Sequence, residues 1–296
     1  MNTLHLQYII EIERTRSISQ AAENLFIGQP NLSRILHDLE EGVGFRIFER
    51  TSRGVRPTER GSKFLQHARG ILREMEYIDA LGPRHVVTDR LRVCLPRSAA
   101  MLDATAQYIA SLDARGSLDA QIRECHARRA IQMLTAGEAE IAVIRFRLEY
   151  REFFEEQAAE NDFAFQILRR FKYDLLMPKD HPLASRAVIH TADLEEYPEI
   201  VHGDAQRPRS KPEEAERRRI YTVDRQAQFS MLSTIWGAYM WIGQVPEQYL
   251  ERWGLIQREC VDNPSTYYDA LVYNPQYTMT EIEAGFMQHI IRENQK

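Results

Sequence analysis

Apolar residues recur every three or four positions over the first eighty residues, which is the spacing of amphipathic helices. Three short helices are predicted, with a tight break at residues 26–28 between the second and the third. Ser19 is placed to cap the second helix, and Pro30 fits the permissive first turn of the third. The three apolar faces are Leu4, Tyr8 and Ile12, then Ala21, Ala22 and Leu25, then Leu32, Ile35, Leu36 and Leu39. Two helices joined by so short a glycine-containing turn predict a helix-turn-helix.

Two short runs, GVGFRIF and TSRGVRPT, follow the third helix and predict a two-stranded wing with Gly54 at its tip. Thr58 then caps a longer helix, in which apolar residues recur with alternating spacings of four and three. Such spacing is typical of a coiled-coil seam, so we expect this helix to pair with a second copy of the chain. Because the repeat covers only about two to three heptads, packing against its own domain remains the alternative. The seam residues are Phe64, Ala68, Ile71, Met75 and Ile78.

The pattern changes at the segment LGPRHVVTDR, which places a domain boundary at residues 82–90. Strands and helices alternate from there to Arg145. The predicted strands are 91–95, 121–125 and 140–145, and the predicted helices start at Ser98 and span 127–135. This βαβαβ order with short connections predicts a parallel, doubly wound sheet.

A second α/β unit is predicted after it, with a helix that starts at Arg225. A strand at 269–273 and a helix that Thr280 caps, with Glu283 three residues on, close the chain. The second unit's strands lie near 165–168, 173–177, 200–202, 220–223, 239–242 and 255–259. Two such Rossmann-like lobes leave a cleft where strand ends converge. The predicted domains are a winged helix-turn-helix at 1–60, a linker helix and hinge at 61–90, and a two-lobed domain at 91–296, with lobe I at about 91–163 and 268–296 and lobe II at about 164–267.

Composition narrows the possible functions. The 296 residues are 44% hydrophobic and 27% charged, as in globular proteins, and the net charge is −5. Residues 1–90 hold 13 Lys and Arg against 12 Asp and Glu, whereas the rest holds 25 against 31. Five arginines fall within residues 44–60, at positions 46, 50, 53, 56 and 60. Positive charge is therefore local, and it favours a nucleic-acid contact at one edge of the molecule.

Three widely spaced cysteines, Cys94, Cys125 and Cys260, form no CxxC pair. This predicts a reducing compartment, with neither a disulfide framework nor a metal site, and we expect no cofactor. The N-terminus mixes acids and bases and is not a signal peptide, so we expect a cytoplasmic protein. The longest charge-free run, 226–246, is interrupted by Gln, Ser and Thr and predicts a buried helix and strand, with no membrane contact.

The start of the third helix carries polar side chains that can reach base edges or phosphates. The wing arginines would lie along the DNA backbone and the minor groove beside it. An isolated basic loop is usually only a solvated surface, but its attachment to a helix-turn-helix favours DNA binding. The candidate DNA-binding residues are Ser19, Gln29, Pro30, Asn31, Ser33 and Arg34, together with Arg50, Arg53 and Arg56 on the wing.

The run SISQAAENLFIGQPNLSRILHDLEEGVGFRIFERTSRGVRPTERG resembles the winged helix-turn-helix of LysR-type transcriptional regulators. The resemblance extends more weakly over the remaining chain through DHPLA at 180–184, the turn at 243–246 and the C-terminal helix. The residues in register are Ala21, Ala22, Leu25, Gln29, Pro30, Ser33, Arg34, Leu39, Glu40, Gly44, Phe48, Arg50, Pro57, Thr58 and Gly61.

Two positions depart from the family pattern. Gly28 stands where the family usually has Ser, which removes a side-chain cap at a cost of only a few tenths of a kcal/mol. Asn31 replaces a small or apolar residue and could add an adenine contact. The Asn31 departure bears on which operator is preferred and leaves DNA binding itself unaffected.

The resemblance implies a periplasmic-binding-protein-like sensor whose cleft holds a small inducer. Arginines and the N-terminus of the Ser98 helix would favour an anionic ligand. The implied ligand-binding residues are Arg97, Ser98, Ala99, Cys125, His126, Arg145, Arg147, His202, Gln226 and Gln228. The resemblance also implies promoter DNA, RNA polymerase and further copies of the chain, as a homodimer or homotetramer, as partners.

Two alternatives remain open from the sequence. A redox-sensing regulator of the same fold would use Cys125 beside His126, whereas buried inert thiols are the plainer interpretation. A two-lobed solute-binding protein or enzyme with a helical extension is the other alternative. No GxSxG, HExxH or Walker motif supports an enzyme, so we expect none.

Overall fold

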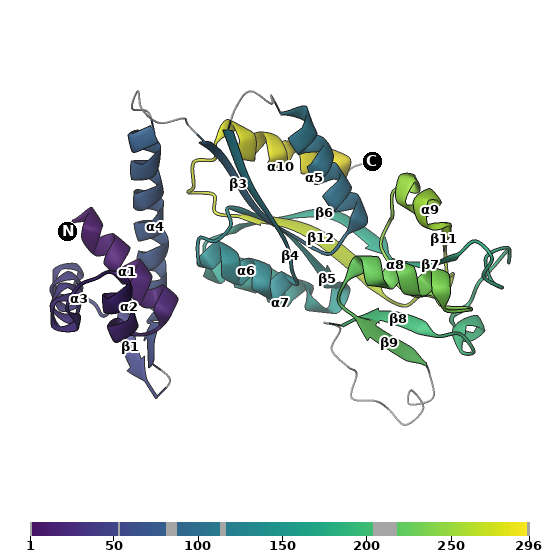
Figure 1. Cartoon of the computed structure of the whole chain (residues 1–296), viewed down its shortest axis with the longest axis horizontal. Helices are drawn as coiled ribbons and strands as arrows, with labels where there is room; N and C mark the ends of the chain where they lie inside the picture. Colours follow the sequence, from purple (N-terminus) through teal and green to yellow (C-terminus); the bar gives the residue numbers. More distant parts are fainter. Residues whose placement is uncertain (1, 53, 81–87, 113–116, 204–217, 295–296) are drawn as a thin grey trace.

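The computed structural model describes residues 2–52, 54–80, 88–112, 117–203 and 218–294. A small helical domain lies at one end of the molecule, and a larger α/β domain forms the rest (Figure 1). One long helix, α4, stands between them (Figure 1). The domain order therefore follows the change of pattern along the sequence.

The N-terminal domain packs three helices and a two-stranded wing around one apolar core. Its elements are α1 (Thr3–Thr15), α2 (Ile18–Asn24), α3 (Gln29–Val43), β1 (Phe48–Thr51) and β2 (Gly54–Pro57). In α1 the buried residues are Leu6, Ile9 and Ile12, while the predicted core residue Leu4 is exposed. Apolar residues lie on more than one side of α1, so periodicity alone could not select the buried face.

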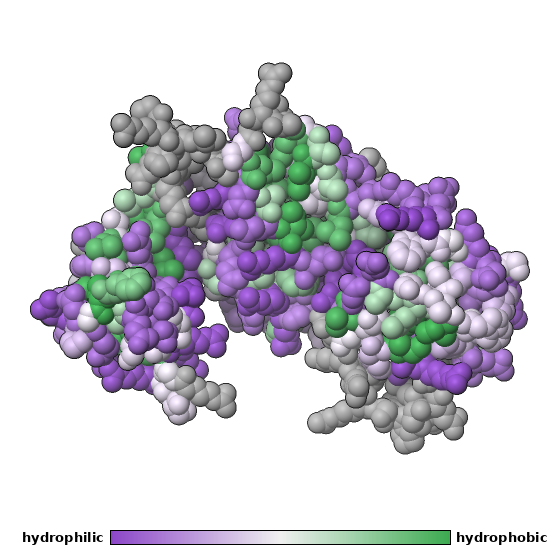
Figure 2. Space-filling view, in the orientation of Figure 1, coloured by the Kyte–Doolittle hydropathy of each residue, from purple (hydrophilic) through white to green (hydrophobic). Residues whose placement is uncertain are grey.

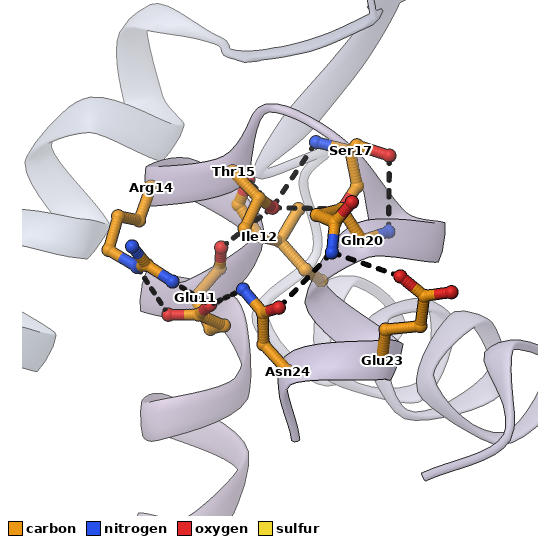
Figure 3. A network of polar contacts seen from close by, with 8 residues as sticks. All are labelled: Glu11, Ile12, Arg14, Thr15, Ser17, Gln20, Glu23 and Asn24. Carbon is orange, nitrogen blue, oxygen red and sulfur yellow. Dashed lines mark hydrogen bonds and ion pairs between the residues drawn. The ribbon is translucent and has the colours of Figure 1, made fainter. Parts of the chain in front are cut away.

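A polar network joins α1 to α2, and it corrects the predicted helix cap (Figure 3). Ser17, not Ser19, caps α2, because the Ser17 hydroxyl accepts from the backbone N–H of Gln20 at 3.3 Å. Ser19 is the second residue of α2 and is exposed. Asn24 donates to Glu11 at 2.7 Å and accepts from Gln20 at 3.2 Å, which ties the end of α2 to α1.

Helix α4 (Glu59–Ala80) begins as expected, with the Thr58 hydroxyl accepting from Gly61 N–H at 2.9 Å. The predicted seam divides in two. Phe64 and Ala68 pack into the N-terminal core, as the alternative interpretation requires. The later seam residues Ile71, Met75 and Ile78 are exposed, Ile78 by 63%. The first half of α4 therefore packs against its own domain, and its second half carries an exposed apolar strip.

The first lobe of the α/β domain is built on a five-stranded sheet of order β4-β3-β5-β12-β6. Its strands are β3 (Thr88–Leu95), β4 (Ser117–Glu124), β5 (Ile141–Arg147), β6 (Ala164–Lys172) and β12 (Thr266–Tyr273). The first three strands are parallel, whereas β12 runs antiparallel to both β5 and β6. The sheet is therefore mixed, and β6, which the sequence placed with the second lobe, pairs in the first.

Helices cover this sheet, and their caps agree with the sequence pattern. Ser98 caps α5, and Thr280 with Glu283 forms the predicted capping box of α10. The helices are α5 (Ala99–Ser111), α6 (Ala127–Thr135), α7 (Arg151–Glu160), after a short 3₁₀ turn at Leu148–Tyr150, and α10 (Glu281–Glu293).

The second lobe differs from the predicted parallel unit. Its main sheet, β10-β7-β11, is antiparallel, whereas β8 and β9 pair in parallel. The elements are β7 (Asp174–Pro178), a 3₁₀ turn (Thr191–Leu194), β8 (Glu199–His202), β9 (Arg219–Thr222), α8 (Arg225–Thr234), β10 (Met240–Ile242), α9 (Glu247–Trp253) and β11 (Leu255–Arg258). The charge-free run at 226–246 falls in α8 and β10, as expected, and none of the helices described could cross a membrane.

Candidate functional site

Helix α3 presents the candidate recognition surface on a firmly anchored base. Leu32, Leu36 and Leu39 are buried in the domain core on one side of the helix. Gly28 is the N-cap and supplies no side-chain hydrogen bond, while Pro30 lies in the first turn. The opposite side at this end of α3 is therefore open to a partner.

The predicted contact residues of α3 form two pairs on this exposed surface. The Gln29 amide donates to the Ser33 hydroxyl at 2.9 Å, and the Arg34 guanidinium donates to the side-chain oxygen Oδ1 of Asn31 at 2.9 Å. Gln29, Asn31 and Arg34 are exposed, and Ser33 is half-buried. Each pair limits side-chain freedom before a partner arrives, which lowers the entropy that binding costs.

The wing presents its two described arginines on different faces. Glu49 lies opposite Arg56, and Arg50 lies opposite Val55, so the two arginines point to opposite sides of the ribbon. Arg56 forms an ion pair with Glu49 at 2.6 Å, and Arg50 is exposed. One of the two described wing arginines, Arg56, is therefore already neutralised by an acidic residue of the wing. Arg53, the third predicted arginine, lies outside the described residues.

The wing is fixed against the helices by Glu40, Gly54 and Gly61, although the sequence pattern assigned this role to none of them. Glu40 accepts backbone N–H bonds from Ile47 at 2.7 Å and Phe48 at 3.0 Å, which joins α3 to the wing. Gly54 has φ of +114°, and a Cβ there would overlap the Arg16 carbonyl oxygen. A Cβ on Gly61 would likewise overlap the carbonyl oxygen of Ile47. The dense match at Glu40 and Gly61 was the signal that could have shown these roles.

The predicted cleft residues Arg97 and His202 meet across the two lobes. Arg97 donates to His202 Nδ1 at 3.1 Å, and His202 Nε2 then donates to the Val223 carbonyl oxygen at 3.0 Å. Ala99 is buried in the apolar cluster of the second lobe, although α5 belongs to the first. The lobes therefore contact each other at the start of α5.

Glu124, which the sequence did not single out, occupies the predicted anion position. Its Oε1 accepts from the Ser98 backbone N–H at 3.2 Å and from Arg225 at 2.8 Å. Ser98 is buried and opens α5, whose N-terminal N–H groups favour an anion. Arg225 belongs to the second lobe, so this carboxylate joins the two lobes through an ion pair. Local pattern could not reveal the pair, because its partners are about a hundred residues apart.

Arg145 and Arg147 are held by contacts away from Arg97. Arg145 pairs with Asp269 through two bonds of 2.7 and 2.9 Å, and Arg169 reaches the same carboxylate at 2.8 Å. Asp269 is fully buried; burial alone would lower the pKa of Arg145, but Asp269 raises it above its usual value. Arg147 donates to Ser265 at 2.7 Å. These arginines brace β5 against β12 and its neighbours.

The remaining predicted ligand residues have structural bonds of their own. His126 caps α6, because its Nδ1 accepts from Arg129 N–H at 3.3 Å. Gln228 is buried and donates to the Thr222 carbonyl oxygen at 3.2 Å. Gln226 is exposed at the start of α8. No group of three potential ligands places a metal site in the described part of the chain.

Cys125 directly follows β4 and lies near Cys94 of β3, whose thiol is also 3.5 Å from the Met133 sulfur. Hydrogen bonding from the Cys94 thiol lowers the pKa of Cys125, against the effect of burial, and Arg129, Arg97 and Arg123 lower it further. The same hydrogen bond, together with burial, raises the pKa of Cys94. Burial raises the pKa of Cys260 to about 12. Cys125 is therefore the thiol that most readily becomes a thiolate among the three.

A winged helix-turn-helix joined through one long helix to a two-lobed α/β domain defines a modular binding protein. The model of bacterial regulatory helix-turn-helix proteins of the lysR family matches residues 4–62, and that of the LysR substrate binding domain matches residues 84–295. Because the second match covers most of the sequence, the chain belongs to the LysR family.

Curated relatives match over part of their length. An uncharacterized HTH-type transcriptional regulator of Escherichia coli K12, YnfL, is 28% identical over 66% of this chain and 63% of its own. AlsR, an HTH-type transcriptional regulator of Bacillus subtilis, is 28% identical over 68% of this chain and 64% of its own. A hydrogen peroxide-inducible genes activator of Pectobacterium carotovorum is 25% identical over 66% of this chain and 62% of its own. The chain thus spans less than two thirds of the length of these relatives.

Solved structures share the fold over nearly the whole chain. Full-length LysG from Corynebacterium glutamicum with bound effector Arg has a TM-score of 0.67 at 15% identity, covering 99% of this chain and 98% of that one. A full-length OxyR variant from Pseudomonas aeruginosa has a TM-score of 0.59 at 18% identity, covering 100% of this chain and 95% of that one. At such identities the likeness concerns the fold alone.

Proposed function

We propose that this protein is a sequence-specific DNA-binding transcriptional regulator, and not an enzyme, that acts on promoter DNA in the cytoplasm. The observation that carries the proposal is the exposed start of α3, where Gln29 with Ser33 and Asn31 with Arg34 form two oriented pairs. Amide and guanidinium groups are the side chains that read adenine and guanine edges in the major groove. Family membership and the wing beside α3 support the same function.

Two copies of the chain are needed to grip an interrupted palindrome, because two recognition helices must enter successive major grooves. The exposed strip Ile71, Met75 and Ile78 on α4 is the surface that we assign to this pairing. Apolar side chains also gather over the part of the face where Figure 1 places α5 and β4 (Figure 2). Since β4 is an edge strand, pairing there would join dimers into a tetramer that bends promoter DNA and meets RNA polymerase.

The cleft is proposed to bind a small anionic metabolite. Such an anion would enter beside Arg97 and compete with Glu124 for the Ser98 N–H and for Arg225. A ligand that displaces the Glu124 carboxylate would break the ion pair between Glu124 and Arg225, which joins the two lobes. It would therefore favour one arrangement of the lobes over another. The change would reposition the paired DNA-binding domains and thereby alter transcription.

Genomic fragments selected by the purified full chain, with and without candidate metabolites, test this function. We expect enrichment of a few promoter fragments, with affinity that falls steeply as salt rises. Neighbouring genes would then indicate the metabolite, and its addition should shift the footprint. Absence of enrichment even at low salt would refute the DNA-binding proposal.

A redox-sensing function is a second candidate, because hydrogen bonding and nearby arginines lower the pKa of Cys125. One relative at 25% identity is named a hydrogen peroxide-inducible genes activator. A thiolate attacks peroxide, giving a sulfenic acid and hydroxide, which would place a new polar group at the start of α6. If this function operates, peroxide changes promoter binding in the wild type and not in Cys125→Ser. Equal responses in the two proteins would exclude it.

A further inference from the structure

One side of α4 contacts the α/β domain through polar residues. We call Lys63, Gln66 and Arg69 the basic side of α4. Lys63 Nζ donates to Asp162 at 3.1 Å, and Arg69 Nη2 donates to the Thr135 carbonyl oxygen at 2.6 Å. Figure 1 shows α4 standing next to α6 and α7. The two domains therefore touch within one chain, at a surface distinct from the exposed apolar strip.

The partner surface consists of the C-terminal ends of two helices. Thr135 is the last residue of α6, and Asp162 follows the end of α7 by two residues. The Thr135 hydroxyl donates to Asn161 Oδ1 at 3.0 Å, which joins the two helix ends. Carbonyl groups in the last turn of a helix lack intrahelical donors and carry partial negative charge. The cations of α4 thus meet a surface of opposite polarity.

Arg69 is the central residue of this contact. Its side chain is only 11% exposed, and it also forms an ion pair with Glu13 of α1. Burial raises the pKa of Glu13, and Arg69 opposes that shift. Arg69 therefore ties α1, α4 and α6 together, whereas the Lys63 pair lies at the edge, where solvent weakens it.

A small cavity lies at the junction between the domains. It has a volume of about 20 Å³, which is room for one water molecule. Gln66 lines it from α4, and the first lobe contributes both apolar residues, such as Leu134 and Phe163, and polar residues, such as Glu140 and Tyr277. The junction thus leaves a water-sized gap and is not packed like a continuous core, which fits a separable domain contact.

We propose that the basic side of α4 is a docking surface that seats the DNA-binding domain on the first lobe of the same chain. This docking surface contacts the C-terminal end of α6. The N-terminal end of α6 is capped by His126, which directly follows Glu124 and Cys125 in the sequence. Nine helical residues span about 13 Å. The cleft and the DNA-binding domain therefore touch opposite ends of one short helix, which gives cleft rearrangement a direct route to the position of α3.

Zero-length carbodiimide coupling of the full chain tests the seat without any DNA, so its outcome is independent of the proposed function. We expect an amide between Lys63 and Asp162, identified by mass spectrometry. Lys63→Arg keeps the charge but cannot form a stable amide, so the linked peptide should vanish. A mixture of ¹⁵N-labelled and unlabelled chains distinguishes a bond within one chain from a bond between chains.

Substitutions then test what holds the seat. Lys63→Asp and Asp162→Lys should each abolish the linked peptide, and the double swap should restore it. Arg69→Met should lower its yield severalfold, whereas the matched change Arg60→Met on the exposed start of α4 should not. Linked peptides that join a ¹⁵N-labelled chain to an unlabelled one would overturn the proposal. So would the absence of a linked peptide in either the wild type or the variant that carries both Lys63→Asp and Asp162→Lys.

Discussion

The recognition surface and the cleft use the same polar residue types in opposite ways. On α3, Arg34 is exposed and has a small neutral partner, Asn31, that a DNA base can replace at little cost. Beside the cleft, Arg145 is buried against a carboxylate, and Arg225 is bound to Glu124. The exposed surface therefore keeps its charges available to a partner, whereas the arginines between and beside the lobes are balanced by carboxylates of the same chain.

Removing the Asp269 carboxylate should have the largest effect. Asp269→Ala leaves Arg145 and Arg169 without their shared buried counter-charge, so we expect about 3 to 5 kcal/mol less unfolding free energy. Denaturant titration measures the loss. The matched change Glu149→Ala, beside the exposed Arg147, should stay within about 0.5 kcal/mol. A loss below about 1 kcal/mol would contradict the role of Asp269 as the shared buried counter-charge.

Truncation of the recognition residue should come next. Arg34→Ala is expected to weaken operator binding by about 1 to 3 kcal/mol if Arg34 reads a base. Titration of the selected promoter fragment against an unrelated fragment separates specific from general binding. Arg34→Lys keeps the charge and loses the fork of donors, so recovery of affinity in that variant would assign Arg34 to a phosphate. Unchanged affinity in Arg34→Ala would refute the contact altogether.

Thiol reactivity sharpens the comparison within the cleft. Because the pKa of Cys125 is lowered, its thiolate fraction rises at lower pH than that of an ordinary thiol. Iodoacetamide should therefore label Cys125 first at neutral pH. As the pH is raised, the labelling rate of Cys125 should reach its plateau at a lower pH than that of Cys260, whose pKa is about 12. Peptide mapping over a pH series measures the order, with Cys125→Ser as control. Equal labelling of the three cysteines would contradict the assignment.

The smallest effect is expected on the wing. Glu49→Gln releases Arg56 from its ion pair and should steepen the salt dependence of DNA binding by up to about one unit of slope, as one added phosphate contact does. Stability should change by less than about 1 kcal/mol, because the pair is exposed. Affinity measured from low to moderate salt gives the slope. A slope equal to that of the wild type would place Arg56 away from the DNA.

Local patterns predicted the elements of this protein better than their partners. The caps at Gly28, Thr58, Ser98 and Thr280 agree with the structure, because a cap depends on residues within one turn. The predicted cap Ser19 was wrong and Ser17 caps α2, because either serine side chain could cap a helix that begins there.

Pairings between distant residues were beyond reach of the pattern. Residues 164–172 pair with β12, which lies about a hundred residues further along the chain. The partners of Glu124 and Asp269 are separated from them by similar distances in sequence. Predicting that the arginines face an anion was sound chemistry, but the sequence could not show that the chain supplies carboxylates of its own.

Gly54 and Gly61 hold the wing by bringing backbone against backbone, with no side chain in between. Such a contact requires the absence of a Cβ at each glycine and does not depend on the side chains of the surrounding residues. A saturation library selected for folding alone should therefore be nearly empty at these two positions, while the exposed wing residues vary. Wings from other sequences with both glycines could be exchanged into this scaffold to alter operator preference without rebuilding its core.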